Sequence, residues 1–500
     1  MKKYDDIVVG AGIGGLTLAV LLSMNNRKVL LLEKNASIGG AMKRFYRKGA
    51  PFDTGFHFTG GFYKGGVLHD MLTVLGIHDY IEPVFLSTGE ANRFVFESDG
   101  LAYDMQPGIS NLRQNLKKYF PGEQMAIDKY FDMVTMVSEK TVSLDLRKIS
   151  MSPDVIEEDF ISLDEVLNGL TQNKLLKALL STYTMCYGVK PEEISFANHS
   201  RVCYGLYESV ARIKRGGEAF IDAFKGEISR LGIDVMCNSY IVDCQDINND
   251  YVGRFVLNNG QEFTCENCIF TIHPQEIVKV LPKKHLTRAF IDRVSSFEPT
   301  IGFFLVFGLI LDEKPCEDFK STIVSLLPAA DFNQLLSPDY QGKSALVIMR
   351  SLEEAGGKIY KTINTFEPSF AKTVEAWKDS KIGRRPKTYQ EYKKKRIERI
   401  RQRICQYYPQ YNDSLNIVDA ASILTFRDYL NSPDGSAYGI KQKIGQYNLF
   451  GKLPLRNVYA AGQSSVLPGI VGAMLSSFIV GRSIIGKNDY NNFIENRLCN

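Results

Sequence analysis

The amino-acid sequence is poor in several features that mark other classes of protein. Its 500 residues include one Trp, six His and nine Cys, and no Cys precedes Cys186. An odd number of scattered cysteines is not a disulfide framework, so we expect a protein of a reducing compartment. Neither a metal-ligand spacing nor a Ser, His and Asp order typical of nucleophilic catalysis stands out, and we expect no metal site.

Strong net charge and long hydrophobic runs are missing as well. Sixty Lys and Arg against 56 Asp and Glu leave a net charge of +4, which is too small to indicate a nucleic-acid-binding protein. The longest apolar stretch, near Ile301–Leu311, is shorter than the roughly 20 residues that cross a bilayer and is typical of a buried strand. Lys2 and Lys3 precede an apolar run, but Asp5 and Asp6 interrupt it, which argues against a signal peptide. We expect a cytoplasmic protein, with peripheral contact with a membrane left open.

What is present is the composition of a large globular protein. Hydrophobic residues make up 44% of the chain and charged residues 23%, a balance that excludes wholesale disorder. Five hundred residues exceed one ordinary hydrophobic core, so we expect two closely joined domains. The 25 Tyr and 30 Phe supply aromatic rings suited to apolar walls.

The first 33 residues predict a β-α-β unit. Asp6–Val9 begins a strand, and apolar residues recur at helical spacing over Leu16–Leu22. Lys28–Leu32 is a continuous apolar run, which is typical of a parallel strand covered on both faces.

A glycine-rich motif, Gly10–Gly15 (GAGIGG), joins the first strand to the helix. Gly10 permits the tight turn, Gly12 lets the backbone approach a diphosphate, and Gly15 lets the helix pack close to the sheet. The free N–H groups of the helix N-terminus attract the same anion. Glu33, 23 positions after Gly10, can accept both ribose hydroxyls of an adenosine. This context predicts a dinucleotide site; the alternative is a glycine-rich turn without a ligand.

Periodicity along the rest of the chain predicts further elements. We expect helices over Leu112–Tyr119, Leu163–Leu180, Ala219–Leu231 and Gly469–Ile485, and strands over Arg93–Glu97, Arg254–Leu257, Glu262–Cys265, Cys268–Thr271 and Val458–Ala461. Residues 298–312 are strand-rich, and a long polar stretch with helical character follows to about residue 410. Because no internal repeat or linker separates these parts, we expect the first and last strand–helix units to share one domain.

Four blocks spread over most of the chain carry a family resemblance. They are Val8–Leu16 with Glu33 and Gly39-Gly40; Phe52–His57 (FDTGFH); Arg215–Gly217; and Asn457–Gly481, which contains Tyr459–Gln463 and Pro468–Ala473. Thr425–Tyr429 and Gly435–Gly439 add to them. Together they resemble the flavin amine oxidase and phytoene desaturase superfamily, and within it the carotenoid isomerase and retinol saturase branch.

The resemblance implies an α/β fold, with a Rossmann-like FAD-binding domain of the flavin amine oxidase type and an inserted α+β substrate-binding domain. Residues 1–60, 211–275 and 415–490 are expected in the first domain, and 61–210 and 276–414 in the second. The residues implied to bind FAD are Gly10, Gly12, Ile13, Gly14, Gly15, Glu33, Lys34, Gly39, Gly40, Arg44, Ile241, Gly462, Gln463, Gly469, Ile470 and Gly472. Gln463 stands where many flavoproteins of this fold carry Asp, and its amide can also form hydrogen bonds.

For function, the resemblance implies an FAD-dependent oxidoreductase that acts on carbon–carbon bonds of an apolar isoprenoid or polyene lipid. It would be a desaturase, saturase or isomerase that exchanges hydride with flavin N5. The alternatives on the same fold are a flavin amine or porphyrinogen oxidase and a non-redox escort protein for prenylated GTPases. No second GxGxxG lies between a strand and a helix, so we expect an external electron acceptor or donor. The substrate and the direction of reaction stay open.

Three further features have competing interpretations. His57 is the candidate for substrate contact or proton transfer, with a structural role as the alternative. Cys265 and Cys268 form a single CxxC, expected at a strand edge without a metal or redox role. The segment Arg384–Arg403 holds ten Lys and Arg with interleaved Tyr and Ile, which predicts an amphipathic helix. Its cationic face is either solvated or docks on anionic lipid.

Overall fold

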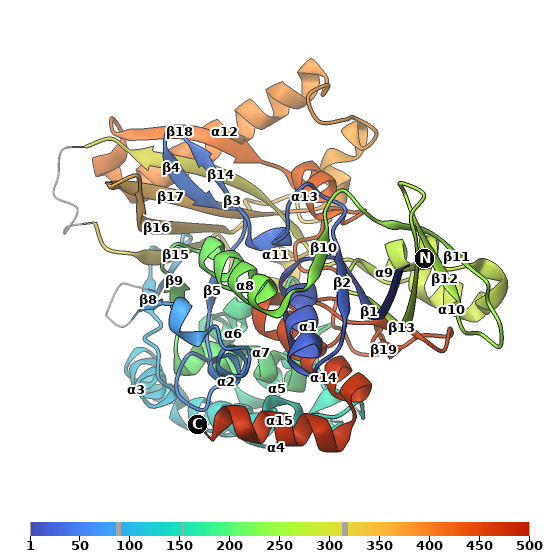
Figure 1. The fold of residues 1–500 in the computed structure, drawn as a ribbon. Helices are drawn as coiled ribbons and strands as arrows, with labels where there is room; N and C mark the ends of the chain where they lie inside the picture. Colours follow the sequence, from blue (N-terminus) through green and yellow to red (C-terminus); the bar gives the residue numbers. More distant parts are fainter. Residues whose placement is uncertain (1, 87–91, 153–154, 313–318, 500) are drawn as a thin grey trace.

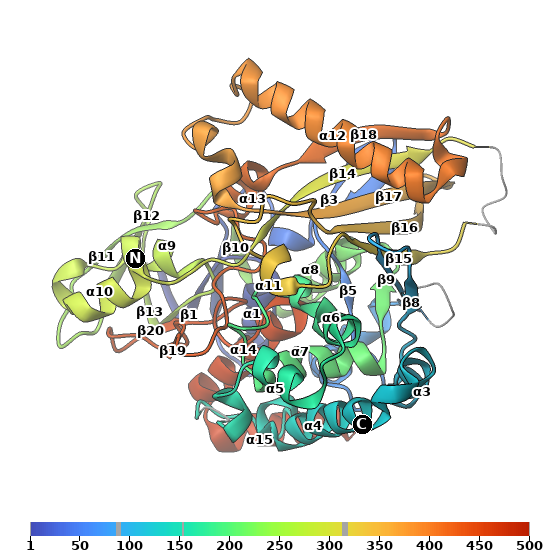
Figure 2. The same ribbon diagram turned by 180° about the vertical axis from the view of Figure 1, so that it is seen from behind.

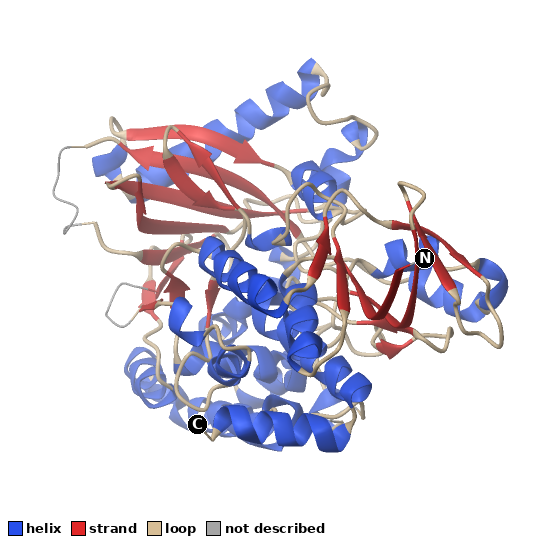
Figure 3. Ribbon diagram, in the orientation of Figure 1, coloured by secondary structure: helices blue, strands red, loops and turns tan. Residues whose placement is uncertain are grey.

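Two β-sheets, each assembled from distant parts of the sequence, organise the chain (Figure 1). The structure is a computed structural model that describes residues 2–86, 92–152, 155–312 and 319–499. Figure 3 shows the strands gathered in two groups, with most helices on one side of the molecule.

The first sheet is built around the strands that flank the glycine-rich motif. Its central strands β1 (Lys2–Val9), β2 (Val29–Leu32) and β13 (Glu262–Phe270) are parallel, and β1 and β2 carry the apolar runs of strands covered on both faces. The strand order is β10-β2-β1-β13-β12-β11, with β20 also on β13 and β19 on β20. These further strands are β10 (Asp234–Met236), β12 (Arg254–Leu257), β11 (Ile241–Gln245), β20 (Val458–Ala460) and β19 (Gly451–Lys452).

Helices cover both faces of the first sheet. One apolar core joins it to α1 (Ile13–Met24), α8 (Gly217–Leu231) and α14 (Gly469–Ile485). The opposite face packs against α9 (Pro274–Val280) and α10 (Arg288–Ser295). The first and the last strand–helix units therefore share one sheet, as the sequence predicts.

The second sheet has seven strands, in the order β18-β14-β17-β16-β15-β7-β8. All neighbours are antiparallel except β15 and β7, which are parallel. The strands are β18 (Leu415–Ala421), β14 (Gly302–Ile310), β17 (Lys358–Ser369), β16 (Leu346–Ala355), β15 (Thr322–Leu327), β7 (Asn92–Phe96) and β8 (Ala102–Asp104). Since β18 belongs to this sheet, we propose that the domain boundary expected at residue 415 lies after Ala421.

Side chains of β14 alternate between the two faces of the second sheet. Phe304 and Val306 face α12 (Lys387–Tyr407), whereas Phe303 and Phe307 face the opposite core. That core includes a group of helices that Figure 2 shows on the side of the sheet away from α12. They are α3 (Ile109–Tyr119), α4 (Gln124–Lys140), α5 (Leu163–Leu170), α6 (Lys174–Ser181) and α7 (Phe196–Glu208).

Smaller elements complete the described chain. A hairpin of β3 (Arg44–Arg47) and β4 (Ala50–Asp53) packs against the second sheet. A three-stranded sheet joins β5 (Phe58–Thr59), β9 (Ala211–Ile213) and β6 (Pro83–Phe85). The remaining helices are α2 (Val67–Val74), α11 (Phe332–Leu335), α13 (Ile423–Leu430) and α15 (Lys487–Leu498).

Most predicted elements are confirmed within one to three residues, and four expectations are wrong. The two strands expected over Glu262–Cys265 and Cys268–Thr271 are one strand, β13, because this segment pairs with β1 along its length. The helix expected over 163–180 is two helices, because Thr171 ends α5 and Asn173 caps α6. The polar stretch before residue 410 contains the strands β15, β16 and β17 ahead of α12, since ladder pairing overrides its weak helical pattern. Cys265 and Cys268 are buried in the central strand β13, not at an edge.

The predicted basic helix is α12, and much of its charge is satisfied by the protein itself. Arg396 and Arg399 bind the buried Glu367 of β17 at 2.5 Å and 2.9 Å, and Arg403 binds Glu97 at 2.8 Å. These cations are therefore turned toward the sheet. None of the helices described is both long enough and apolar enough to span a bilayer.

We predict that Glu367→Gln lowers the free energy of unfolding by about 3–5 kcal/mol, because it leaves the buried Arg396 without its counter-charge. The measurement is the midpoint of urea denaturation. Glu398→Gln is the matched control: Glu398 lies at an exposed position of α12, the helix that carries Arg396, and its substitution should leave the midpoint unchanged. Equal midpoints for both variants would contradict this account of α12.

Candidate functional site

A cavity of about 1010 Å³ lies between the two sheets. One end is formed where β1, β2 and β13 finish, at Val9, Leu32 and Thr271. The carboxyl ends of parallel strands are the usual ligand-binding edge of such a sheet. The other end is formed by residues of the second sheet, including Phe303 and Phe366. The volume lies at the upper end of the ~300–1,000 Å³ typical of ligand pockets.

The glycine-rich motif forms the cavity wall at the start of α1. A Cβ on Gly12, the N-cap of this helix, would meet no atom within 4 Å, so the backbone faces open space. A Cβ on Gly15 would lie 1.8 Å from the Gly10 carbonyl oxygen, so Gly15 is required for packing. The helix N-terminus thus presents free N–H groups to a space that an anion can enter.

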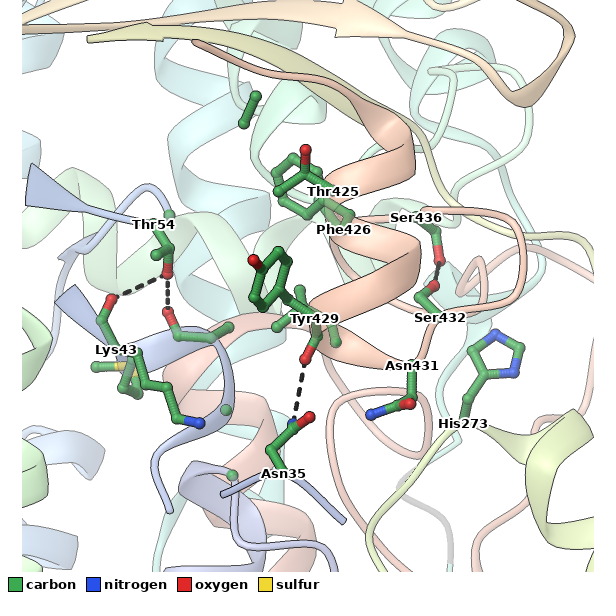
Figure 4. Close-up of a pocket in the computed structure, with 18 of the residues that line it drawn as sticks. Asn35, Lys43, Thr54, His273, Thr425, Phe426, Tyr429, Asn431, Ser432 and Ser436 are labelled. Carbon is green, nitrogen blue, oxygen red and sulfur yellow. Dashed lines mark hydrogen bonds between the residues drawn. The ribbon is translucent and has the colours of Figure 1, made fainter. Parts of the chain in front are cut away.

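Glu33 follows β2 and is held by two backbone amides. Its Oε2 accepts a hydrogen bond from Ala11 N at 2.9 Å, and its Oε1 accepts one from Asn35 N at 2.8 Å. A carboxylate has about four acceptor positions, so it retains capacity for ligand hydroxyls. Asn35 Nδ2 reaches across to the Tyr429 carbonyl at 3.2 Å, as Figure 4 shows.

Helix α14 closes the same end of the cavity. Gly462, Gln463, Gly469 and Ile470 line it, so the positive end of the helix dipole is directed to the ligand space. Gly472 lies behind this surface, where a Cβ would be 2.0 Å from the Leu467 carbonyl oxygen.

Aromatic rings form the opposite part of the wall. The lining residues are Phe45, Phe56, Phe303, Phe307, Phe366, Phe426 and Tyr438. Phe45 packs edge-on against Phe307 at 4.8 Å, and Phe303 packs edge-on against Tyr438 at 6.2 Å between ring centroids. We call these seven residues the aromatic chamber. Its surface suits an apolar molecule rather than a charged one.

Four largely buried charged residues tie the β3–β4 hairpin and β9 to the second sheet beside this chamber. Arg44 of β3 binds Asp53 of β4 at 2.9 Å and Glu353 of β16 at 2.5 Å. Arg212 of β9 binds the other oxygen of Glu353 at 2.8 Å. Asp53 also accepts a hydrogen bond from Gly217 N at 3.1 Å. Two cations and two carboxylates therefore compensate each other inside the protein.

The pKa values of the two carboxyl groups shift in opposite directions. Burial would raise the pKa of Asp53, but His57, Arg44 and the Gly217 amide outweigh burial and hold it below its ordinary value. Burial raises the pKa of Glu353 above its ordinary value, despite the opposing influence of Arg44 and Arg212. Asp53 is therefore the more firmly charged member.

His57 is buried in the cavity wall, with a hydrogen bond at Nε2 and a charge contact at Nδ1. Nε2 lies 3.0 Å from the Ala41 carbonyl oxygen, and Nδ1 lies 3.2 Å from Asp53 Oδ1. A ring placed in this way orders the segment around Thr54 and supports Asp53. This geometry favours a structural role over proton transfer to a ligand.

The structure brings most of the residues implied by the resemblance to one cavity. Its lining includes Gly10, Gly12, Ile13, Gly14, Glu33, Lys34, Gly40, Arg44, Gly462, Gln463, Gly469, Ile470 and His57. Four others lie outside the lining: Gly15 and Gly472 are packing positions, Gly39 is a left-handed turn residue beside Ile221, and Ile241 is buried in a core. Ser239 and Tyr240 line the cavity ahead of Ile241.

Sequence reasoning did not find the aromatic chamber, Glu353 or His273. Chamber residues come from six separate segments, so no local pattern identifies them. His273 follows β13 by three residues and lines the cavity. A polar residue just after a parallel strand was the one available signal for it.

The residues present fit a dinucleotide such as FAD. Gly12 leaves room for a diphosphate at a helix N-terminus, and Glu33 has spare acceptor positions at the ribose end. Lys34 Nζ lies 5.6 Å from the centroid of the Tyr240 ring beside Glu33. Helix α14 supplies a second N-terminus at the same end of the cavity, and we call Gly10–Gly15, Glu33 and this N-terminus the dinucleotide cradle.

Comparisons with known proteins give a consistent result. A family model described as an NAD(P)-binding Rossmann-like domain matches residues 8–74. The all-trans-retinol 13,14-reductase of Danio rerio is 26% identical over 97% of this chain and 87% of its own length. Prolycopene isomerase 2 of an Oncidium hybrid cultivar is 28% identical over 30% of this chain and 25% of its own length.

Solved structures share the fold. Cyclohexylamine oxidase from Brevibacterium oxydans superposes with a TM-score of 0.63 at 14% identity, over 99% of each chain. The architecture of two sheets around one cavity is thus shared with cyclohexylamine oxidase.

We predict that Gly12→Val abolishes dinucleotide binding and leaves the thermal midpoint of the apoprotein unchanged, because its side chain enters open space. Gly15→Ala is the matched contrast: its Cβ meets the Gly10 carbonyl, so the apoprotein itself should lose stability. Equilibrium dialysis against FAD and differential scanning fluorimetry measure the two effects. Retained FAD affinity in Gly12→Val would contradict this placement of the cofactor.

We predict a pH-dependent stability difference between the wild type and Asp53→Asn. The pKa of Asp53 is lowered on folding, so its charge stabilises the fold above the unfolded pKa, and that stabilisation is lost as the pH falls. The free energy of unfolding of the variant should be lower by about 3 kcal/mol at pH 7. This difference from the wild type should become smaller below about pH 5. Thermal midpoints at pH 7, 5 and 4 test this, with Asp79→Asn, a fully exposed position, as control. A difference in thermal midpoint that does not change with pH would show that Asp53 acts by packing alone.

Proposed function

This chain belongs to the phytoene desaturase and retinol saturase family of the flavin oxidase superfamily, and on that basis we propose its reaction and cofactor. It is an FAD-dependent oxidoreductase that acts on carbon–carbon bonds of an apolar isoprenoid or polyene lipid. The observation that carries this proposal is the single cavity, which joins a dinucleotide cradle to the aromatic chamber.

Residues from both ends of the chain would hold the cofactor. The N-terminus of α1 and Gly12 bind the diphosphate, and Glu33 binds the ribose of the ADP half. Gln463 and the N-terminus of α14 bind the flavin half of the cofactor. Bound FAD supplies a ring that can take up or release a hydride and electrons.

The chamber residues orient the lipid and exclude water. The edge-to-face rings present an apolar surface, and alignment of one bond of the lipid against it lowers the entropic part of the barrier. Burial raises the pKa of the Tyr438 phenol, so this side chain keeps its proton at neutral pH. Its hydroxyl can therefore donate a hydrogen bond to a polar end of the lipid.

The alternatives are less well supported. Relatives that align over nearly the whole chain are retinol reductases, whereas the amine oxidase matches a common fold at 14% identity. An escort protein has no use for a flavin-capping helix, yet Gly469 and Ile470 start α14 at the cavity.

Membrane contact and an external electron partner are further parts of the proposal. Ile382 and Tyr429 line the cavity and are more than half exposed, so an apolar opening faces solvent. Arg384, Lys387 and Lys394 are exposed nearby in sequence to Ile382. Such a rim suits an anionic lipid surface from which an apolar substrate could enter.

We expect the purified protein to show a flavin absorption band after reconstitution with FAD. Under anaerobic conditions, bleaching by one lipid of a retinoid and carotene panel would identify that lipid as the hydride donor. If no lipid bleaches the band, photoreduced protein should be reoxidised by a polyene, with product mass raised by two hydrogens, or should isomerise it at unchanged mass. A flavin-loaded protein that changes no lipid in either redox state would overturn the proposed function. Gly12→Val serves as the cofactor-free control.

A further inference from the structure

His273 is a buried histidine at the carboxyl edge of the first sheet. It follows β13, is 9% exposed, and begins helix α9 as its N-cap. Its ring lines the cavity, where Figure 4 shows it next to the loop that carries Ser432 and Ser436. Apart from capping α9, the His273 ring takes no part in the contacts described above.

The cap determines which ring nitrogen carries the proton. Gln275 N donates to His273 Nδ1 at 3.4 Å, so Nδ1 is the acceptor. Burial lowers the pKa of His273, and the neutral ring then carries its hydrogen on Nε2.

This Nε2–H has no partner within the described residues. The carboxylate of Asp434 lies 3.9 Å away, beyond hydrogen-bond distance. Asp434 uses its other oxygen for Ser432 Oγ at 3.2 Å and Ser436 N at 2.8 Å. A buried donor without an acceptor is unfavourable, which points to an acceptor supplied by a ligand.

The neighbours of His273 are parts of the dinucleotide cradle. Phe270 of β13 pairs with Val9 on one side and with Ala460 on the other. The residues after these strands therefore meet: a Cβ on Gly10 would lie 2.8 Å from Ile272 Cγ2, and one on Gly462 would lie 3.3 Å from the Thr271 carbonyl oxygen.

We propose that His273 is a cofactor-binding residue whose Nε2–H donates a hydrogen bond to an oxygen atom of the bound dinucleotide. The inference rests on the proposed function, because it needs a dinucleotide in the cradle. His273 and Gln463 then approach the ligand from the ends of two neighbouring strands, β13 and β20.

The decisive variant is His273→Asn. Asn is a strong N-cap residue, so α9 keeps its cap while the shorter side chain loses the Nε2–H donor. Titration of the apoprotein with FAD, followed by flavin fluorescence, should show about tenfold weaker binding, a change of ~1.4 kcal/mol. His285→Asn, at a histidine bound to Asp250 outside the cavity lining, should bind FAD as the wild type does. Titration with ADP locates the contact, since only a contact to the ADP half weakens ADP binding.

The outcomes are distinguishable. A wild-type apoprotein that binds no FAD would overturn the proposed function and this inference together. Wild-type protein that binds FAD, with His273→Asn equal to it, would overturn the inference alone. Equal losses of thermal stability in His273→Asn and Asp434→Asn, at unchanged FAD affinity, would assign the ring to a structural contact with Asp434 and overturn the inference as well.

Discussion

The close packing of α1 against α14 is the contact on which the rest of the site depends. Ser477 Oγ donates to the Gly14 carbonyl at 2.8 Å, and a Cβ on Gly14 would lie only 3.2 Å from the Ala473 carbonyl. On α14, a Cβ on Gly481 would lie 2.6 Å from Leu21. Glycines at this crossing let two helices, separated by most of the chain, place their N-termini at one cavity.

A second constraint fixes the β3–β4 hairpin on the second sheet. Arg44 and Asp53 belong to the hairpin that follows the nucleotide motif, whereas Glu353 belongs to the second sheet. Such buried charges are costly unless all are paired, so the network specifies one arrangement of hairpin and sheet. Gly216 belongs to the same arrangement, since a Cβ there would lie 2.1 Å from Asp53 Oδ1. The Arg215–Gly217 block is thereby explained.

These two constraints place chemically different surfaces on one cavity. The first assembles backbone N–H groups and Glu33 for a polar, anionic ligand. The second holds the face of β14 that presents Phe303 and Phe307 opposite that cradle. A cofactor with a diphosphate and a planar ring, together with an apolar substrate, suits such a division. Binding and orientation are then the main tasks of the protein, and the cofactor carries the chemistry.

The β-α-β unit, Gly12, Glu33 and the helix Gly469–Ile485 could all be predicted from the sequence, because each follows from local periodicity or from the spacing of the glycine-rich motif. The four sequence blocks were also sufficient to indicate the family. The sequence did not predict the strands β15, β16 and β17, whose order is set by pairing with distant partners. The tertiary structure was needed to show that Gly472 is a packing position, that α12 turns cations toward Glu367, and that His273 reaches the cavity. Those roles depend on what lies across the space from each side chain, which spacing along one chain does not encode.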